Sequence, residues 1–81
     1  MLVDVRQHSE LAGLRIPGAV HLELGDIIAG ATPAGPEIVM FCGHGERSAT
    51  AASLIERRRP RVANLVGGTA AWIDADLPVE R

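Results

Sequence analysis

The strongest constraint on the fold of this chain is a short apolar segment, residues 37–41. After Glu37 its four residues are all apolar, so a strand built from them is apolar on both faces. Continuous apolar strands of this kind belong in the middle of a parallel sheet that is covered on both sides. The segment therefore predicts an α/β fold in which this strand is central.

The rest of the chain supplies the other elements that such a sheet needs. Apolar runs predict three further strands, over residues 2–6, 19–22 and 62–66. Four segments have helical character, residues 11–14, 27–29, 47–58 and 70–75. Ser9 is the expected cap of the first, Pro60 the expected stop of the third, and residues 30–36 form a loop. Strands that alternate with helices imply a parallel sheet with helices on both faces.

Size and composition narrow the class of protein. A chain of 81 residues fits one small domain, residues 1–81. Its hydrophobic fraction of 47% is typical of a globular domain, and a net charge of −2 argues against nucleic acid as a main partner. No apolar run approaches the roughly 20 residues of a membrane span, so no membrane partner is expected. The single cysteine excludes an internal disulfide and is consistent with a cytoplasmic location.

The candidate site lies at Cys42, where the central strand ends. Parallel sheets bind their ligands at the carboxyl ends of the strands. Residues 43–46 form a short loop, and the next helix is expected to start near Arg47. Such a loop can turn its N–H groups inward as an anion nest, and Gly43 and Gly45 permit the positive φ that this often requires. The helix N-terminus adds further N–H groups and the positive end of its dipole.

Two interpretations of Cys42 compete. A cysteine at the end of a strand is ordinarily a buried and inert small hydrophobe. Inside an N–H cradle at a helix N-terminus, however, the pKa of the thiol falls and the nucleophilic thiolate is populated near neutral pH. The loop and helix that follow Cys42 favour the reactive interpretation, in which no neighbouring general base is required.

Four segments resemble the signatures of rhodanese homology domains, in the same order and with similar spacing. Residues 2–6 (LVDVR) resemble the first signature, and residues 16–19 (IPGA) resemble the second. Residues 42–48 (CGHGERS) look like the active-site loop. Residues 64–68 (NLVGG), with Trp72, resemble the C-terminal signature. The resemblance covers almost the whole chain and implies a rhodanese-like three-layer α/β/α domain with a short parallel sheet.

The resemblance implies a sulfurtransferase. Cys42 would take a sulfane sulfur from thiosulfate or a persulfide, hold it as a persulfide, and pass it to a thiophilic acceptor such as cyanide or a thiol. Donor and acceptor would be small molecules or protein persulfides, and no cofactor is implied. The implied substrate-binding residues directly follow the cysteine: Gly43, His44, Gly45, Glu46, Arg47 and Ser48.

Individual roles also come from the resemblance. Residues 42–47 would cradle the sulfur with backbone N–H groups, Arg47 would help to bind anionic donors, and Ser48 would either cap the helix or bond the sulfur. Asp4 and Arg6 would support the site structurally, and their spacing suggests an ion pair. The three histidines and one cysteine show no metal-ligand spacing, so no metal site is expected.

Three neighbouring residues carry further expectations. Glu46 is either an exposed loop charge or a partner of Arg47 that weakens its pull on anions. With an acid beside the only full positive charge of the loop, thiosulfate, a dianion, is expected to be a poor donor. His44 is expected to be exposed, and Trp72 to lie in the core under the sheet.

The family resemblance also predicts the spatial order of the four parallel strands: fourth, third, first, second. The strand and helix that usually precede the first signature are absent from this sequence, so the strand over residues 62–66 would be a bare edge. Bare edge strands pair with other chains, which predicts self-association, for example as a homodimer.

Two other functions compete with sulfur transfer. Cysteine-dependent phosphatases and arsenate reductases also hold a thiolate in an anion cradle, with a Cys-x5-Arg spacing. Here four residues separate Cys42 from Arg47, and the smaller loop suits a sulfur atom better than a tetrahedral oxyanion. The second alternative is a non-enzymatic module that binds a partner protein. Such modules often lose the cysteine, whereas this chain keeps it together with the glycines and Arg47.

Overall fold

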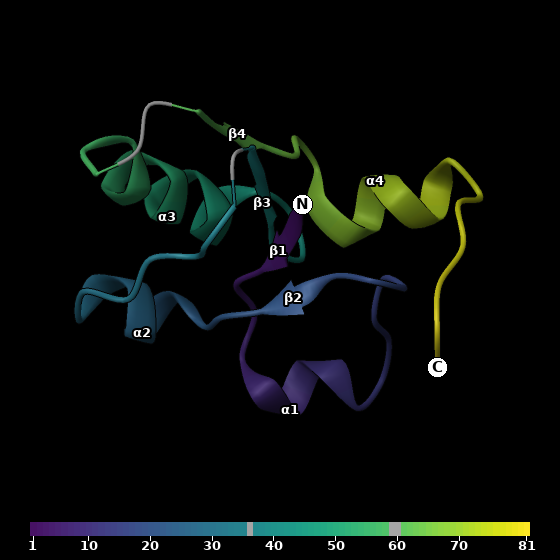
Figure 1. The fold of residues 1–81 in the computed structure, drawn as a ribbon. Coiled ribbons are helices and arrows are strands. Elements are labelled where there is room, and N and C mark those ends of the chain that lie inside the picture. The colour runs from purple at the N-terminus through teal and green to yellow at the C-terminus, as the bar shows by residue number, and fades with distance from the viewer. Residues whose placement is uncertain (36, 59–60) are drawn as a thin grey trace.

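The computed structural model describes residues 1–35, 37–58 and 61–81, whose arrangement is shown in Figure 1. Strands and helices follow one another as β1 (Leu2–Asp4), α1 (His8–Leu11), β2 (Val20–His21), α2 (Leu24–Ile28), β3 (Ile38–Phe41), α3 (Glu46–Glu56), β4 (Val62–Asn64) and α4 (Gly68–Asp74). Each predicted strand and helix is present, with shifted ends. The predicted helix stop at Pro60 and the loop end at Pro36 lie outside the described residues.

The first helix begins earlier than predicted. Ser9 was the expected cap, but α1 already begins at His8. The reason is a capping box, in which the side chain of Gln7 meets the backbone of Glu10 and the side chain of Glu10 accepts from the Gln7 N–H. The acid of this capping box also reaches the candidate site.

The four strands form one parallel sheet in the order β2-β1-β3-β4, which confirms the predicted order. Met40 of β3 lies opposite Val3 of β1 on one side and Asn64 of β4 on the other, so β3 is central. Cys42 follows β3 directly and therefore lies at the carboxyl edge of the sheet. Within the described residues, β4 pairs on one side only and forms an edge of the sheet.

The main core lies between one face of the sheet and the helices α2 and α3. Val3 and Met40 from the sheet, Ile27 from α2 and Ile55 from α3 are fully buried there. Burial of one such side chain contributes about 1.5–3 kcal/mol. Ala51 of α3 is also fully buried, and its small side chain lets the helix lie close to the strands. The core thus fixes β3 and α3, the two elements between which the loop after Cys42 runs.

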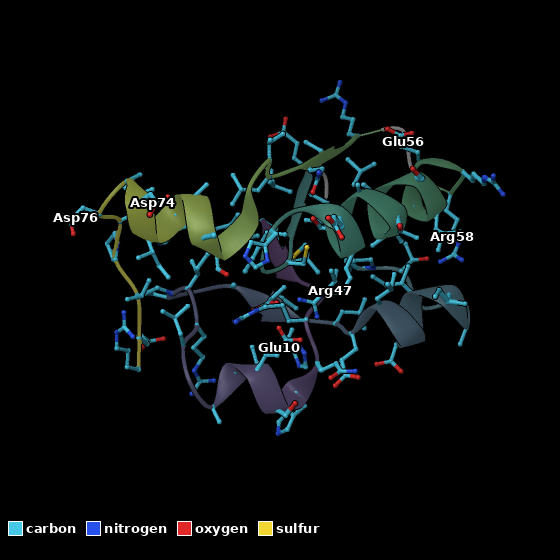
Figure 2. All side chains as sticks on the ribbon, turned by 180° about the vertical axis from the view of Figure 1, so that it is seen from behind. Glu10, Arg47, Glu56, Arg58, Asp74 and Asp76 are labelled. Atoms are coloured by element: carbon cyan, nitrogen blue, oxygen red, sulfur yellow. The ribbon has the colours of Figure 1, made fainter. Side chains whose placement is uncertain are left out.

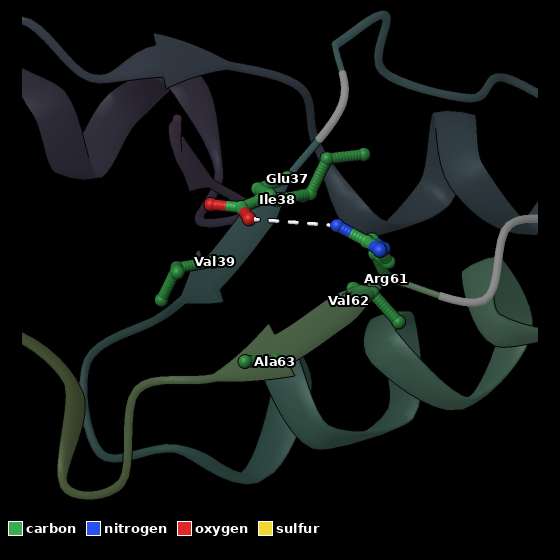
Figure 3. A pocket seen from close by; sticks show the side chains of 6 residues that line it. All are labelled: Glu37, Ile38, Val39, Arg61, Val62 and Ala63. Atoms are coloured by element: carbon green, nitrogen blue, oxygen red, sulfur yellow. Dashed lines mark ion pairs between the residues drawn. The ribbon is translucent and has the colours of Figure 1, made fainter.

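The opposite face of the sheet is covered unevenly. In Figure 1, α4 lies on the other side of the sheet from α2 and α3, and Phe41 is fully buried near the carboxyl edge. At the amino edge, Ala63 is exposed and borders a cavity of about 290 Å³ (Figure 3). Glu37 and Arg61 form an ion pair of 3.8 Å at this cavity.

Trp72 does not lie in the core, so that prediction is wrong. Its ring is half-buried on α4, and its indole N–H donates a hydrogen bond of 2.7 Å to the carbonyl of Pro78 in the C-terminal segment. Glu80 of the same segment pairs with Arg15 through two backbone hydrogen bonds. Across residues 1–35, 37–58 and 61–81, no helix has the length and apolar character needed to cross a membrane.

Candidate active site

Cys42 is a free, buried cysteine at the carboxyl end of β3. Two backbone N–H groups donate to its Sγ atom, from Gly45 at 3.0 Å and from Ser48 at 3.4 Å. Gly45 is the N-cap of α3 and Ser48 lies in its first turn, so the positive end of the helix dipole points at the sulfur. These contacts form an N–H cradle around the sulfur atom.

The cradle changes the acidity of the thiol. Burial raises the pKa of Cys42, because it disfavours the charged thiolate. The side chain of Ser48 and hydrogen bonds from the N–H groups of Ser48, Gly45 and His44 lower the pKa by more, so that it lies below its ordinary value. The thiolate is the nucleophilic form of cysteine, so the geometry favours the nucleophilic form of Cys42.

The two glycines of the loop have different uses. Gly45 has φ of 105°, a left-handed conformation that a side chain would strain. Gly43 does not have a positive φ, so the prediction is wrong for this residue. A Cβ at Gly43 would lie 3.3 Å from Nη2 of Arg47. The absence of a side chain there leaves room for the guanidinium group beside the loop.

The start of α4 holds the loop from the other side. The N–H of Thr69 donates to the carbonyl of Cys42 at 2.8 Å, and the N–H of Ala70 donates to the carbonyl of Gly43 at 3.0 Å. In a trans peptide the C=O and N–H groups point in opposite directions. Fixing the Gly43 carbonyl on α4 therefore turns the N–H of His44 away from α4, and this N–H is one of the groups that lower the pKa of Cys42.

Gly68 makes this close approach possible. It has φ of 56°, and a Cβ on it would collide with the carbonyl oxygen of Cys42. A tight turn between β4 and α4 therefore accounts for only part of the role of Gly68. The sequence could not reveal the rest, because the contact joins segments that lie 26 residues apart, as the hydrogen bond from Thr69 Oγ1 to the Gly43 carbonyl also does.

Asn64, at the end of β4, is a residue of the site that the sequence analysis did not single out. Its Nδ2 donates to the carbonyl of Gly45 at 3.4 Å, and its Oδ1 accepts a hydrogen bond from the Ser48 hydroxyl. The same hydroxyl lies 3.2 Å from the carbonyl of Gly45. Ser48 is not the helix cap, because Gly45 occupies that position. Asn64 thus ties the first turn of α3 to the neighbouring strand.

Arg47 and Glu10 face each other at the edge of the loop, as Figure 2 shows. Nη1 of Arg47 lies 2.5 Å from Oε1 of Glu10, and Nη2 lies 3.1 Å from Oε2. The hydrogen bond from Arg47 lowers the pKa of Glu10 even though burial raises it. The carboxylate that engages Arg47 is thus that of Glu10, and the exposed Glu46 has no such bond among the described contacts. Glu10 is not among the predicted site residues, because it lies 37 residues from Arg47 in the sequence.

The ion pair between Asp4 and Arg6 is present and buried. Nη2 of Arg6 lies 2.8 Å from Oδ2 of Asp4, and the two side chains are 6% and 2% exposed. Arg6 also donates to the carbonyl of Leu14 at 2.7 Å, and its own carbonyl lies 2.8 Å from Nε2 of His21. The pair fastens the end of β1 to the segment that follows α1, the helix that carries Glu10.

A second pocket, of about 260 Å³, lies beside the cradle. Its apolar lining comes from Val5, Leu24 and Ile28, and its polar lining includes Glu23 and Arg47. The cavity at the amino edge of the sheet is slightly larger but lies at the other end of β3. The pocket at Arg47 is therefore the better candidate for a substrate. His44 is exposed, as predicted, and residues 1–35, 37–58 and 61–81 contain no cluster of side chains that could hold a metal ion.

The chain is similar to known proteins over most of its length. Residues 1–75 match the family described as Rhodanese-like domain. A curated protein named sulfurtransferase, from Allochromatium vinosum, is 38% identical over 98% of this chain and 77% of its own length.

Two solved structures are similar in fold. The thiosulfate sulfurtransferase from Pseudomonas aeruginosa superimposes with a TM-score of 0.81 and 26% identity, over 98% of this chain and 16% of its own. A protein of unknown function from Rhodopseudomonas palustris, described as a possible tyrosine phosphatase, gives a TM-score of 0.87 and 30% identity over 99% of this chain and 70% of its own. The two descriptions name sulfur transfer and phosphate-ester hydrolysis, both of which a nucleophilic cysteine can perform.

Proposed function

The chain belongs to the rhodanese-like domain family, and from this premise we propose that it is a sulfurtransferase that carries a sulfane sulfur on Cys42 as a persulfide. The observation that supports the proposal most directly is the cradle in which the N–H groups of Gly45 and Ser48 donate to Sγ. A cradle of this kind stabilises a negative charge on sulfur, and that charge is present both before and after the transfer.

The reaction has two displacement steps. The thiolate of Cys42 attacks the outer sulfur of the donor, a new S–S bond forms, and the old S–S bond breaks with its electron pair leaving on the donor remnant. Thiosulfate would release sulfite, and an organic persulfide would release a thiolate. In the second step a nucleophile such as cyanide or a thiolate attacks the outer sulfur and Cys42 leaves as thiolate. No net oxidation occurs and no proton has to be moved by a protein base.

The residues around the cysteine would have distinct roles in this cycle. The N–H groups of Gly45 and Ser48 would stabilise the thiolate and the persulfide anion. Arg47 would orient the donor, and Asn64 and Thr69 would hold the loop in shape. Asp4 and Arg6 would support the site from below without contact with the sulfur.

The phosphatase alternative is less well supported. Four residues separate Cys42 from Arg47, and Arg47 is engaged by Glu10 instead of pointing freely over the cradle. A phosphoryl group needs positive charge around its three equatorial oxygens. The single, partly neutralised guanidinium supplies little of it.

A non-enzymatic, partner-binding module is the remaining alternative. Such a module has no need of a thiol with a lowered pKa, and here the pKa of Cys42 is lowered. Since the transfer depends on a reduced thiolate, we propose a cytoplasmic location, where thiols are kept reduced.

The proposal is tested by measuring the intact mass of the protein after incubation with thiosulfate or with an organic persulfide. We expect one added sulfur, which cyanide removes as thiocyanate. Cys42→Ser is nearly isosteric and is the matched control, which should fold and gain no sulfur. A wild-type protein that gains no sulfur from either donor, or a Cys42→Ser protein that gains it equally, contradicts the proposed function.

A further inference from the structure

The mouth of the sulfur-transfer site carries more negative than positive charge. Three charged side chains meet there: Arg47 supplies one positive charge, and Glu10 and Glu23 each supply one negative charge. Arg6 lies nearby, but its charge is already paired with Asp4 in a buried bidentate contact. A dianionic donor therefore approaches a mouth with no surplus cation to attract it.

Arg47 binds Glu10 through the same two nitrogens that would bind an anionic donor. Two nitrogens of its guanidinium group face the two carboxylate oxygens of Glu10, at 2.5 Å and 3.1 Å. A planar guanidinium uses the same fork to bind sulfonate, sulfate or phosphate oxygens. The oxygens of thiosulfate would therefore compete with Glu10 for Arg47.

The pocket beside Arg47 fits a different kind of group. Val5, Leu24 and Ile28 give it an apolar lining, and Ile28 is 62% exposed although it is a large hydrophobic side chain. Its volume of about 260 Å³ is near the lower end of pockets that hold small organic ligands. An organic group on the donor would cover this apolar surface, which thiosulfate cannot do.

We propose that Glu10 is a specificity-determining residue, which engages Arg47 and thereby directs the site toward sulfur donors of low charge that carry an organic group, and away from thiosulfate. This inference rests on the proposed sulfurtransferase activity. It assigns the substrate class to organic persulfides and related compounds, and it places the acid that opposes anionic donors at Glu10 rather than at Glu46.

Glu10→Gln separates the electrostatic role of Glu10 from its structural role. Glu10 also closes the capping box of α1 by accepting the N–H of Gln7 at 3.1 Å, and glutamine serves this position as well as glutamate does. The substitution removes the charge and keeps the acceptor. Glu37→Gln is the matched control, because it removes an identical charge from an ion pair with Arg61 at the other end of β3, away from the loop.

The test compares two donors that react by the same displacement, with cyanide as acceptor and thiocyanate as product. Thiosulfate is a dianion that leaves as sulfite, and benzenethiosulfonate is a monoanion with an apolar ring that leaves as benzenesulfinate. We expect the wild type to prefer benzenethiosulfonate in kcat/KM. Glu10→Gln should raise kcat/KM for thiosulfate by about two- to fivefold, mainly through KM. The gain is limited because both side chains of the pair are about a third exposed, so solvent screens their charges. The gain for benzenethiosulfonate should be smaller.

The outcomes separate this inference from the proposed function. Glu37→Gln should change kcat/KM for either donor by less than about twofold, because the Glu37–Arg61 pair is exposed and lies away from the loop. Glu23→Gln, which also removes a charge from the mouth, should act in the same direction as Glu10→Gln and serves as a second variant if the first does not fold. A wild type that prefers thiosulfate, or equal effects of Glu10→Gln on both donors, overturns the role of Glu10 while the added sulfur on Cys42 leaves the proposed function intact. No sulfur on Cys42 from either donor overturns both.

Discussion

The backbone nitrogen of Thr69 lies 2.8 Å from the carbonyl oxygen of Cys42, so α4 holds the residue that we propose as the sulfur carrier. The contact depends on Gly68, which precedes Thr69 and touches the loop with its backbone. The shape of the cradle is therefore set by α4 as well as by the strand and helix on either side of the loop.

We predict that Gly68→Ala will damage the cradle. Its Cβ would collide with the carbonyl of Cys42, so the loop or α4 must shift. We expect a loss of about 2–4 kcal/mol in stability and at least about tenfold lower sulfur-transfer activity. Urea unfolding and kcat/KM measure the two effects.

Gly18→Ala is the matched control for the backbone conformation. Gly18 also has a positive φ, of 78°, but a Cβ there would meet no atom within 4 Å. It should therefore cost only about 1–2 kcal/mol for the left-handed conformation and leave the activity of the folded protein unchanged. Equal losses of activity in the two variants would show that the collision at Gly68 has no special effect.

We predict that Cys42 is alkylated by iodoacetamide with a midpoint below the value of about 8.5 for free cysteine. Hydrogen bonds in the cradle lower its pKa in the folded state. The lowered pKa also makes the stability of the protein depend on pH. The contribution of Cys42 to the free energy of unfolding is complete above the pKa of the unfolded state and is lost as the pH falls through the pKa of the folded state. Alkylation rate against pH, compared with a denatured sample, measures the shift. A midpoint at or above that of the denatured sample would mean that the cradle does not form in solution.

The sequence was sufficient to predict the fold and to place Cys42 at the carboxyl end of the central strand. The apolar run of β3, the cysteine at its end and the helix after it are adjacent in the sequence, so their arrangement could be predicted locally. Two other contacts of the site could not be predicted from neighbouring residues. Glu10 lies 37 residues from its partner Arg47, and Asn64 lies 16 residues from its partner Ser48. At Gly43, the residue type permits a positive φ but also permits close approach, and only the structure distinguishes the two.

We predict negligible phosphatase activity. The loop between Cys42 and Arg47 is short, and Glu10 occupies the guanidinium group that would bind a phosphoryl group. Hydrolysis of p-nitrophenyl phosphate should match the rate seen with Cys42→Ser. Turnover above that rate would support the description given to the Rhodopseudomonas palustris relative.

We predict weak self-association through β4. In the described residues this strand pairs only with β3. The carbonyl of Arg61 and the N–H of Leu65 form hydrogen bonds with β3. Because backbone groups alternate in direction along a strand, the N–H of Val62 points away from β3 and leaves an edge that another chain can pair with. Light scattering over a concentration series should show a rising mass. Val62→Pro, which removes that N–H at an edge position, should reduce the rise. A constant monomer mass up to the highest concentration would contradict this prediction.

Our last prediction concerns the buried pair of Asp4 and Arg6. Asp4→Asn leaves the Arg6 guanidinium without its charge partner at a site where the side chain is only 6% exposed. Loss of one partner of a buried ion pair costs about 3–5 kcal/mol, a large part of the roughly 5–15 kcal/mol that stabilises a small domain. Urea unfolding measures the loss, with Glu37→Gln as control, because the Glu37–Arg61 pair is 76% exposed on both sides and should contribute little. Arg6 also donates to the carbonyl of Leu14, just after the helix that carries Glu10. The fraction of Asp4→Asn protein that folds should therefore hold Glu10 less firmly and show an altered KM for thiosulfate. Equal stability of the two variants would show that the buried pair does not support the site.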